Sequence, residues 1–407
     1  MQRRHLGIAL ILLLGAILRI WNLSTPDALV FDEVYYVNGA NDYLANGVET
    51  DGDKPEFVVH PPVGKWAIAA GIKVFGDNPF GWRISAALFG TASILLIYLV
   101  ALRLFKTQFL ALLAAALTVF DGLHLVMSRT ALLDIFLMTF LLAAFLALLY
   151  DRHAIAALAF GLALGTKWSA IYFIAAIFIY LGFKNRKALI NYTLIIPIVY
   201  LISWFGWFSS AKGWARGSSS NPLIALFNYH REILNFHTGL TTDHPYEASP
   251  WSWLILGRPT SFFYESPKSC GATSCSQEIL AMGTPLLWWG ALIAVAVTIG
   301  YFIHRREQTA GLILLALLSN YLPWFLFPEL TTFYFYAIVF QPYLILALCY
   351  AAKVFMEREE LVEKRRQIVI SGLALVALCF LYFLPVYIGM VTTYDQWFAR
   401  MWLPSWV

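Results

Sequence analysis

Charged residues are scarce in this chain of 407 residues: Asp, Glu, Lys and Arg make up only 13% of it, while 60% of the residues are hydrophobic. A soluble globular domain carries about 25% charged and about 45–50% apolar residues. A single aqueous core cannot account for this composition, which indicates a chain embedded in a membrane. The net charge of +4 is divided among short basic clusters between long apolar runs, so nucleic-acid binding is a poor explanation.

The chain also lacks internal repeats, low-complexity stretches and any segment typical of a soluble domain. The inverted repeats of many transporters are not evident either. Met1 to Ile20 has a basic start followed by an apolar stretch, but no A-x-A-like cleavage site follows it. We interpret this segment as an uncleaved first span, and residues 1–407 as a single polytopic membrane domain.

Apolar segments predict an all-α integral membrane fold with about eleven transmembrane helices. Several of them are short or closely spaced, so the count can err by one or two. A shorter stretch at 64–75 is expected to form a surface helix. The predicted spans cover residues 6–22, 83–105, 108–124, 131–150, 154–166, 168–183, 188–208, 283–303, 310–328, 332–352 and 367–389.

The connections between these spans differ in charge. With the N-terminus inside, nearly every inner connection carries Lys or Arg, whereas the outer connections hold most of the Asp, Glu and His. This agrees with the positive-inside rule and predicts a cytoplasmic N-terminus. The inner connections are Arg103/Lys106, Asp151–His153, Lys184–Lys187, His304–Arg306 and Lys353–Arg366, and the outer ones are 23–82, 125–130, 209–282, 329–331 and the tail 390–407.

Two outer connections, residues 23–82 and 209–282, are much longer than the others, so we expect function to lie there. The second contains Cys270 and Cys275, which face an oxidising compartment and are close enough in sequence to form a disulfide. Two free thiols are an equal alternative. Cys349 and Cys379 fall in separate predicted spans and are interpreted as apolar packing.

The first long loop begins with the adjacent carboxylates Asp32 and Glu33 at the membrane surface. Carboxylates that are desolvated together repel one another, so one of them could have a raised pKa and act as a base. Solvated loop acids are the alternative, and the favoured one from this pair alone. Further on, His60 and Lys65 flank two prolines, and together with a carboxylate they suit binding of an anionic group beside a proton transfer. Lys65 by itself would be interpreted as a snorkelling side chain.

Two cations lie on the predicted outer side, where the positive-inside rule does not expect them. Arg83 enters the second span, and Lys167 lies between the fifth and sixth spans. Together they could clamp a phosphate carried by a membrane lipid, because a guanidinium binds phosphate oxygens bidentately. The alternative for Arg83 is a structural ion pair with Asp32, Glu33 or Asp134.

Further polar residues follow these two cations. Arg129 and Asp134 stand five residues apart at the hairpin between the third and fourth spans, where a structural ion pair is favoured over a catalytic role. In the second long loop His230, His237 and His244 lie among aromatic residues, but their spacing follows no compact zinc pattern. Sugar or peptide recognition suits this loop better, with interfacial packing as the alternative.

Taken together, these segments resemble the protein O-mannosyltransferase family, integral-membrane glycosyltransferases of the GT-C class that use a polyprenyl- or dolichyl-phosphate mannose donor. Each block is weak by itself, whereas the ordered combination is specific. The segment 209–282 is compact and has no inserted soluble β-trefoil domain, which resembles a bacterial member. The blocks are Asp32-Glu33, His60-Pro61-Pro62-Val63-Gly64-Lys65, Arg83, Ser128–Asp134, Gly165-Thr166-Lys167-Trp168, His237 and His244–Trp253.

The resemblance implies an inverting transfer of mannose to Ser or Thr hydroxyls of exported proteins on the outer face of the plasma membrane. Asp32 is then expected to be the general base, with Glu33 orienting the acceptor or tuning its neighbour. The residues expected to bind the donor phosphate are Arg83, Lys167, His60 and Lys65. Those expected to support the site or the acceptor side are Arg129, Asp134, His237, His244 and Tyr246.

No metal site is predicted, and a divalent cation such as Mg²⁺ or Mn²⁺ at the acidic pair is left open. The expected partners are the lipid donor, secreted proteins that contain Ser or Thr, the Sec translocon and the surrounding membrane lipids.

Two other functions compete with this interpretation. Another GT-C enzyme could move an aminosugar or arabinose from a lipid phosphate to lipid A or a cell-wall glycan, but the His-Pro-Pro-x-Gly-Lys block and the second-loop motif favour the protein mannosyltransferases. A lipid-sugar transporter would bury ionisable groups near the middle of the membrane. Here the candidate charges collect at one face instead.

Overall fold

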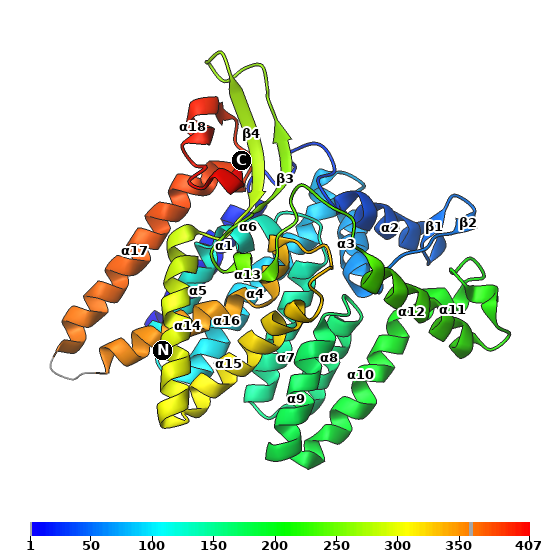
Figure 1. The fold of residues 1–407 in the computed structure, drawn as a ribbon, viewed down its shortest axis with the longest axis horizontal. Coiled ribbons are helices and arrows are strands. Elements are labelled where there is room, and N and C mark those ends of the chain that lie inside the picture. Colours follow the sequence, from blue (N-terminus) through cyan, green and yellow to red (C-terminus); the bar gives the residue numbers. More distant parts are fainter. Residues whose placement is uncertain (1, 358–360) are drawn as a thin grey trace.

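The computed structural model describes residues 2–357 and 361–407, which fold mainly into helices (Figure 1). Met1 and residues 358–360, which belong to the predicted inner connection Lys353–Arg366, lie outside the described residues. Five helical segments of the described chain are long and apolar enough to cross a membrane. They are Pro79–Phe105 (α4), Arg186–Ser203 (with α10, Leu189–Ser203), Pro285–Arg305 (α14), Gln308–Leu326 (with α15, Gln308–Tyr321) and Val362–Tyr387 (α17).

Shorter apolar helices accompany these five. They are His5–Ile20 within α1 (Gln2–Ile20), α5 (Gln108–Val119), α7 (Asp134–Leu149), α8 (His153–Leu164), α9 (Ala170–Lys184) and α16 (Gln341–Met356). The prediction of a multi-pass helical membrane protein is confirmed. The number of eleven spans stays a prediction, because several of these helices are shorter than the hydrocarbon thickness of a bilayer requires.

Two predicted spans are interrupted in the structure. The span 108–124 breaks at Asp121, whose Oδ1 accepts hydrogen bonds from the backbone N–H of Thr284 and from Trp288 Nε1, and a short helix α6 (Gly122–Met127) follows. The span 332–352 begins with an extended segment, because Thr332 Oγ1 donates to the Ala248 carbonyl of the second loop. A 3-10 helix (Tyr334–Val339) comes next, and the regular helix α16 starts only at Gln341.

Both long loops fold into defined elements, including two small sheets that the all-helical expectation did not contain. The first loop forms α2 (Glu33–Asn46), β1 (Thr50–Asp51), β2 (Lys54–Pro55) and α3 (Val63–Phe75), so the predicted helix at 64–75 is confirmed. The second loop, with the residues just before it, forms α11 (Phe205–Ser209), α12 (Pro222–Gly239), α13 (Pro250–Trp253) and the hairpin of β3 (Thr260–Glu265) and β4 (Cys275–Ala281).

Near the C-terminus, β5 (Thr392–Thr393) pairs with β4 and precedes α18 (Tyr394–Phe398), which gives the sheet order β3-β4-β5. The other 3-10 helices are Arg186–Ala188, Arg216–Ser218, Leu322–Leu326 and Pro404–Trp406.

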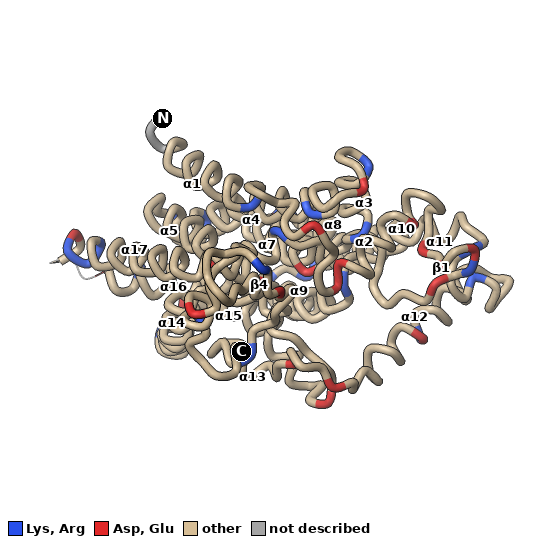
Figure 2. The backbone as a smooth tube through the Cα atoms, turned by 90° about the horizontal axis from the view of Figure 1, so that it is seen from above, with Lys and Arg blue, Asp and Glu red and all other residues tan. Residues whose placement is uncertain are grey.

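These loop elements gather at one end of the helix bundle, which we call the loop face and define as residues 23–78 together with 210–284. In Figure 1 the hairpin β3-β4, helices α2 and α3 and the C-terminus lie at this end. Figure 2 shows that Lys, Arg, Asp and Glu are sparse along most helices and more frequent around α2, α3 and α11. Of the candidate residues, Asp32, Glu33, His60 and Lys65 lie within the loop face.

Helix α4 holds the core beneath the loop face, since it packs against α1, α3, α5 and α7. Gly90 of α4 faces Ser128 directly after α6, and a Cβ at this position would overlap the Ser128 side chain. Small residues permit such close approaches between membrane helices. The close fit fixes the segment that carries Arg129 and Asp134 relative to the first residues of α4, where Arg83 lies.

Candidate active site

Asp32 lies at the start of α2, in a bend of the first loop. Phe31, just before it, has a left-handed backbone with φ 46°, which is uncommon for a bulky residue, and this bend sets the direction of the Asp32 side chain. The half-buried carboxyl accepts a hydrogen bond from the hydroxyl of Tyr36, one helical turn later. Burial raises the pKa of Asp32 to about 6, although the Lys167 ammonium acts to lower it. A carboxylate with this pKa suits a general base near neutral pH.

Glu33 is held by four donors and is fully buried. Its oxygens accept hydrogen bonds from the backbone N–H groups of Val30 and Ala131, and from Arg83 Nε and Nη2 at 2.9 and 2.8 Å. No oxygen of Glu33 is left to share a metal ion with Asp32. Glu33 therefore ties the start of α2 to Arg83 of α4 and to the backbone of Ala131. Its expected roles, orienting the acceptor or tuning its neighbour Asp32, stay predictions.

Arg83 has no N–H group left for a phosphate. A guanidinium has five N–H groups, and here two donate to Glu33 while three donate to the carbonyls of Leu23, Pro26 and Ala28. The side chain is 1% exposed. The prediction that Arg83 binds the donor phosphate is thus contradicted, and the structural ion pair with Glu33 is the alternative that the structure bears out.

Lys167 is the cation that faces Asp32. Its Nζ donates to both carboxylate oxygens of Asp134, at 2.9 and 3.1 Å, and lies 4.2 Å from the centre of the Tyr336 ring. An ammonium has three N–H groups and forms cation–π contacts without using any of them as a conventional donor. Lys167 can therefore still bind an anion beside Asp32, whose pKa its charge lowers.

Arg129 does not form the predicted ion pair with Asp134, because Asp134 pairs with Lys167. Instead, the guanidinium of Arg129 donates to four carbonyls at the end of α1, those of Leu18, Arg19, Trp21 and Asn22. The last carbonyls of a helix lack partners within it. Arg129 satisfies them and anchors the first helix below the loop that carries Asp32.

The His-Pro-Pro segment reaches the same place from the other end of the first loop. The ring of His60 lies 6.0 Å from that of Tyr36 and 5.4 Å from that of His237. His60 Nδ1 is buried without a hydrogen-bond partner, and burial holds the pKa of His60 well below its usual range. A neutral imidazole with a free nitrogen can bind a sugar hydroxyl or a phosphate that enters the site.

Lys65 pairs with an acid other than Asp32. It forms a buried ion pair with Glu49 and donates to the His60 carbonyl at 3.1 Å. The side chain of Lys65 is 3% exposed. Lys65 thus supports the backbone of His60, and its expected contact with the donor phosphate stays a prediction.

The second long loop contributes three of the expected side chains. His237 donates through Nε2 to the Val59 carbonyl at 3.0 Å and lies 6.1 Å from the Trp168 ring. His244 packs against Phe31 with ring centres 6.1 Å apart, and its Nδ1 accepts from the backbone N–H of Tyr246. These contacts join the second loop to the first at Val59 and at Phe31, the residue before Asp32.

Sequence reasoning missed two tyrosines of this site. Tyr36 stands four residues after Asp32 in a helix, and this spacing was the signal that could have placed the hydroxyl beside the carboxyl. Tyr336 lies in the 3-10 helix Tyr334–Val339, far from Asp32 in the sequence, and no spacing or motif around it indicated that it belongs to the site. Both phenol rings enclose the charges of Asp32 and Lys167.

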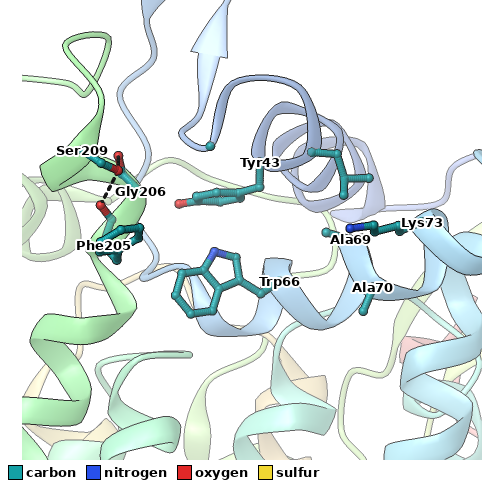
Figure 3. A pocket seen from close by; sticks show the side chains of 10 residues that line it. Tyr43, Trp66, Ala69, Ala70, Lys73, Phe205, Gly206 and Ser209 are labelled. Carbon is teal, nitrogen blue, oxygen red and sulfur yellow. Dashed lines mark hydrogen bonds between the residues drawn. The ribbon is translucent and has the colours of Figure 1, made fainter.

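A groove of about 400 Å³ lies at the C-terminal end of α2, away from Asp32 at its start (Figure 3). It is lined by side chains of α2, α3 and α11, among them Tyr43, Trp66 and Lys73, and neither Asp32 nor Lys167 lines it. Tyr43 donates to Glu49, which in turn pairs with Lys65. Among the described residues, no group of three or more His, Cys, Asp or Glu is arranged to hold a metal ion.

Two family descriptions match the chain and together cover most of it. Residues 9–210 match "Dolichyl-phosphate-mannose-protein mannosyltransferase", and residues 223–406 match "C-terminal four TMM region of protein-O-mannosyltransferase". The chain is 31% identical to a polyprenol-phosphate-mannose–protein mannosyltransferase of Mycolicibacterium smegmatis, over 98% of this chain and 92% of that protein. It is 32% identical to that of Mycobacterium tuberculosis, over 98% and 91%.

Solved structures share the fold at lower sequence identity. The protein O-mannosyltransferase Pmt1-Pmt2 complex of S. cerevisiae, bound to the sugar donor, matches with a TM-score of 0.84 at 14% identity, over 100% of this chain and 93% of that one. ArnT of Cupriavidus metallidurans in the apo state matches with a TM-score of 0.62 at 14% identity, over 94% and 75%. The predicted GT-C architecture is confirmed.

Proposed function

The chain belongs to the protein O-mannosyltransferase family, and we propose that it transfers mannose from polyprenyl-phosphate mannose to Ser or Thr hydroxyls of proteins. The chain is thus a glycosyltransferase. The observation that supports the site is the position of Lys167 close to Asp32 of the loop face: a base with a pKa of about 6 lies near a cation that can bind phosphate. The functions assigned to single residues below are part of this proposal.

Asp32 acts as the general base. It takes the proton of the acceptor hydroxyl while the hydroxyl oxygen forms a bond to the anomeric carbon of mannose. The bond between that carbon and the phosphate oxygen breaks, and its electron pair leaves with the lipid phosphate. Glu33 is fully engaged with Arg83, and Asp134 with Lys167, so neither supplies the second free carboxylate of a double displacement. A single displacement inverts the anomeric centre.

Lys167 stabilises the negative charge that develops on the departing phosphate. His60 offers its free Nδ1 to the donor headgroup, and His237 and His244 with Tyr246 line the side from which the acceptor arrives. Arg83, Arg129 and Lys65 hold the loops that carry these groups. No step in this scheme is assigned to a metal ion.

We place the loop face on the outer side of the plasma membrane and the N-terminus in the cytoplasm. Lys106 follows α4 at its end away from Arg83. Lys184 ends α9, and Arg186 and Lys187 lie between α9 and α10. The positive-inside rule favours such basic clusters for cytoplasmic connections. Secreted proteins that leave the Sec translocon unfolded are the acceptors that this orientation favours.

The proposal is tested with purified protein in proteoliposomes that contain labelled polyprenyl-phosphate mannose. A peptide with a single Thr is expected to become labelled, with inverted configuration at the anomeric carbon. Label that appears on lipid A or on a glycan but not on the peptide would favour the other GT-C transferase. Movement of the labelled lipid between leaflets without any transfer would favour a transporter.

A further inference from the structure

Strand β3 has one edge without a partner strand. In the sheet order β3-β4-β5, β4 is covered on both sides, whereas β3 pairs only with β4. Within residues 2–357 and 361–407, no other backbone segment hydrogen-bonds to Thr260–Glu265. An uncovered strand edge presents a row of free N–H and C=O groups that can pair with another polypeptide.

The inner end of this edge lies beside the proposed base. Phe262 stacks on Phe31, the residue before Asp32, with ring centres 4.9 Å apart and planes inclined by 24°. Phe262 is buried, whereas Tyr264 is 43% exposed. The strand therefore runs from the catalytic site outward, and its last four residues span about 10 Å at about 3.3 Å per residue.

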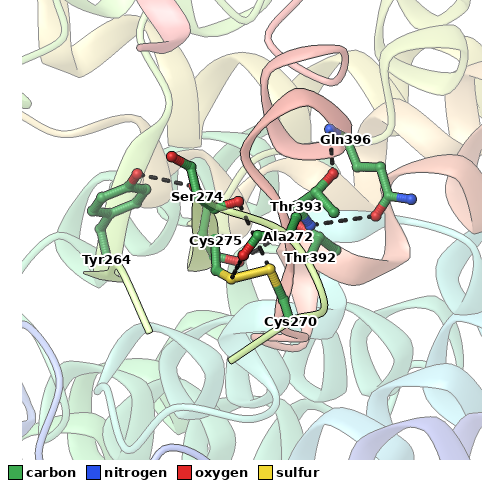
Figure 4. The surroundings of a disulfide bond; sticks show 9 residues. Tyr264, Cys270, Ala272, Ser274, Cys275, Thr392, Thr393 and Gln396 are labelled. Carbon is green, nitrogen blue, oxygen red and sulfur yellow. Dashed lines mark hydrogen bonds between the residues drawn. A yellow bond between two sulfur atoms is a disulfide. The ribbon is translucent and has the colours of Figure 1, made fainter. Parts of the chain in front are cut away.

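The hairpin is held in place from its other side. The Tyr264 ring contacts Trp397, whose Nε1 donates to Glu278 of β4 at 2.6 Å. Cys270 and Cys275 form a disulfide across the tip, and the segment at Thr393 pairs with Cys275 (Figure 4). None of these contacts pairs with the outer edge of β3, whose residues Thr260 to Phe262 are buried and whose residues Tyr264 and Glu265 are exposed. A rigid strand with an unpaired, exposed outer end is suited to bind an extended chain at a low entropic cost.

We propose that the acceptor polypeptide binds in extended form along the free edge of β3, which presents its Ser or Thr hydroxyl to Asp32. This inference rests on the proposed transfer to proteins and adds how the acceptor is recognised. Pairing through main-chain hydrogen bonds gives affinity that depends little on the acceptor sequence. Such binding selects for unfolded segments, because a folded acceptor has no free strand to offer.

The test is an ester scan of the acceptor. Peptides with one Thr and one backbone amide replaced by an ester lose a single N–H donor, and the replacement is moved residue by residue along the peptide. Because N–H groups of a strand alternate between its two sides, kcat/KM is expected to fall about 3- to 10-fold at every second position on one side of the Thr. The positions between them serve as matched controls.

Equal kcat/KM at neighbouring positions on both sides of the Thr would overturn the pairing. The unmodified peptide separates the two proposals, since its mannosylation is the proposed function itself. A scan without alternation on a peptide that is mannosylated overturns the edge pairing alone, and an unmodified peptide that receives no mannose overturns the function on which the pairing rests.

Discussion

Asp32 experiences two opposing influences on its carboxyl. Burial raises its pKa to about 6, and the nearby Lys167 charge limits this rise. As a base, Asp32 must be ionised, so the active fraction is lost as the pH falls through its pKa. We expect kcat/KM to decrease about tenfold per pH unit below about pH 6 and to level off above it. Initial transfer rates in proteoliposomes between about pH 4.5 and 8 measure this, and a flat profile would contradict the assignment.

Lys167→Met should shift the pH at which kcat/KM begins to fall. Removal of the ammonium removes the interaction that lowers the Asp32 pKa, so the midpoint is expected to shift to higher pH, and the KM for the lipid donor to rise. Lys65→Met is the matched control, because it also leaves one buried carboxylate unpaired but its partner Glu49 is a different acid. Neither the pH midpoint of kcat/KM nor the donor KM depends on the amount of folded enzyme. Partial unfolding of a variant therefore does not affect the comparison of Lys167→Met with Lys65→Met.

Arg83→Ala is expected to damage folding more than donor binding. It leaves Glu33 as a buried charge without its partner, which destabilises a protein by about 3–5 kcal/mol. The double variant Arg83→Met with Glu33→Gln should recover part of this loss, because neither charge then remains. Thermal unfolding and the donor KM of both variants are measured together. If Arg83→Ala has a normal melting temperature but a raised KM for the donor, Arg83 binds the donor phosphate and the structural interpretation is wrong.

At the scale of single residues, the sequence identified the reactive side chains better than their partners. The Lys167 charge acts on both Asp32 and His60, the two side chains with which the sequence grouped it. Arg83 was assigned to phosphate and Arg129 to Asp134, because composition and spacing show that a buried charge needs a partner but not which helix supplies it. Those pairings depend on how α1, α4 and the loops pack, which one sequence does not contain.

At the scale of elements, the apolar helices were predictable, and the small sheets were not. Runs of apolar residues predict helices in a membrane whatever their neighbours are. Strands β1 and β5 have two residues each. β1 pairs with its neighbour β2 in a tight hairpin, whereas β5 exists only through pairing with the distant strand β4. The extended start of the span predicted at 332–352 has the same origin, since Thr332 is held by the second loop.

The Cys270–Cys275 disulfide, which the sequence left open, should stabilise the β3-β4 hairpin and not the helix bundle. Replacing both cysteines by Ser is expected to destabilise the hairpin by about 2 kcal/mol, since the closed loop is short. If β3 guides the acceptor, the KM for the peptide rises several-fold while the KM for the lipid donor stays unchanged. Cys379→Ala in α17 is the control, and equal effects of both changes on the two KM values would contradict this role.

At the scale of the whole molecule, distant segments build one site at one end of the bundle. The first loop brings Asp32 and His60, and the segment between α8 and α9 brings Lys167, with the backbone N–H of Val63 donating to the Gly165 carbonyl at 2.9 Å to join them. The charge pattern of the connections indicated this arrangement before any coordinates, because both loops fell on one predicted side. The geometry around Asp32 depends on packing that the charge pattern does not describe.

The most direct test of this account compares single-turnover mannose transfer by the unaltered protein, Asp32→Asn and Asp27→Asn, an exposed acid of the same loop. A raised pKa means that ionised Asp32 disfavours the folded state above about pH 6, so Asp32→Asn should fold at least as stably at neutral pH. We predict that it loses about a hundred- to ten-thousand-fold in rate, while Asp27→Asn keeps its rate. Near-normal transfer by a folded Asp32→Asn enzyme would contradict the account.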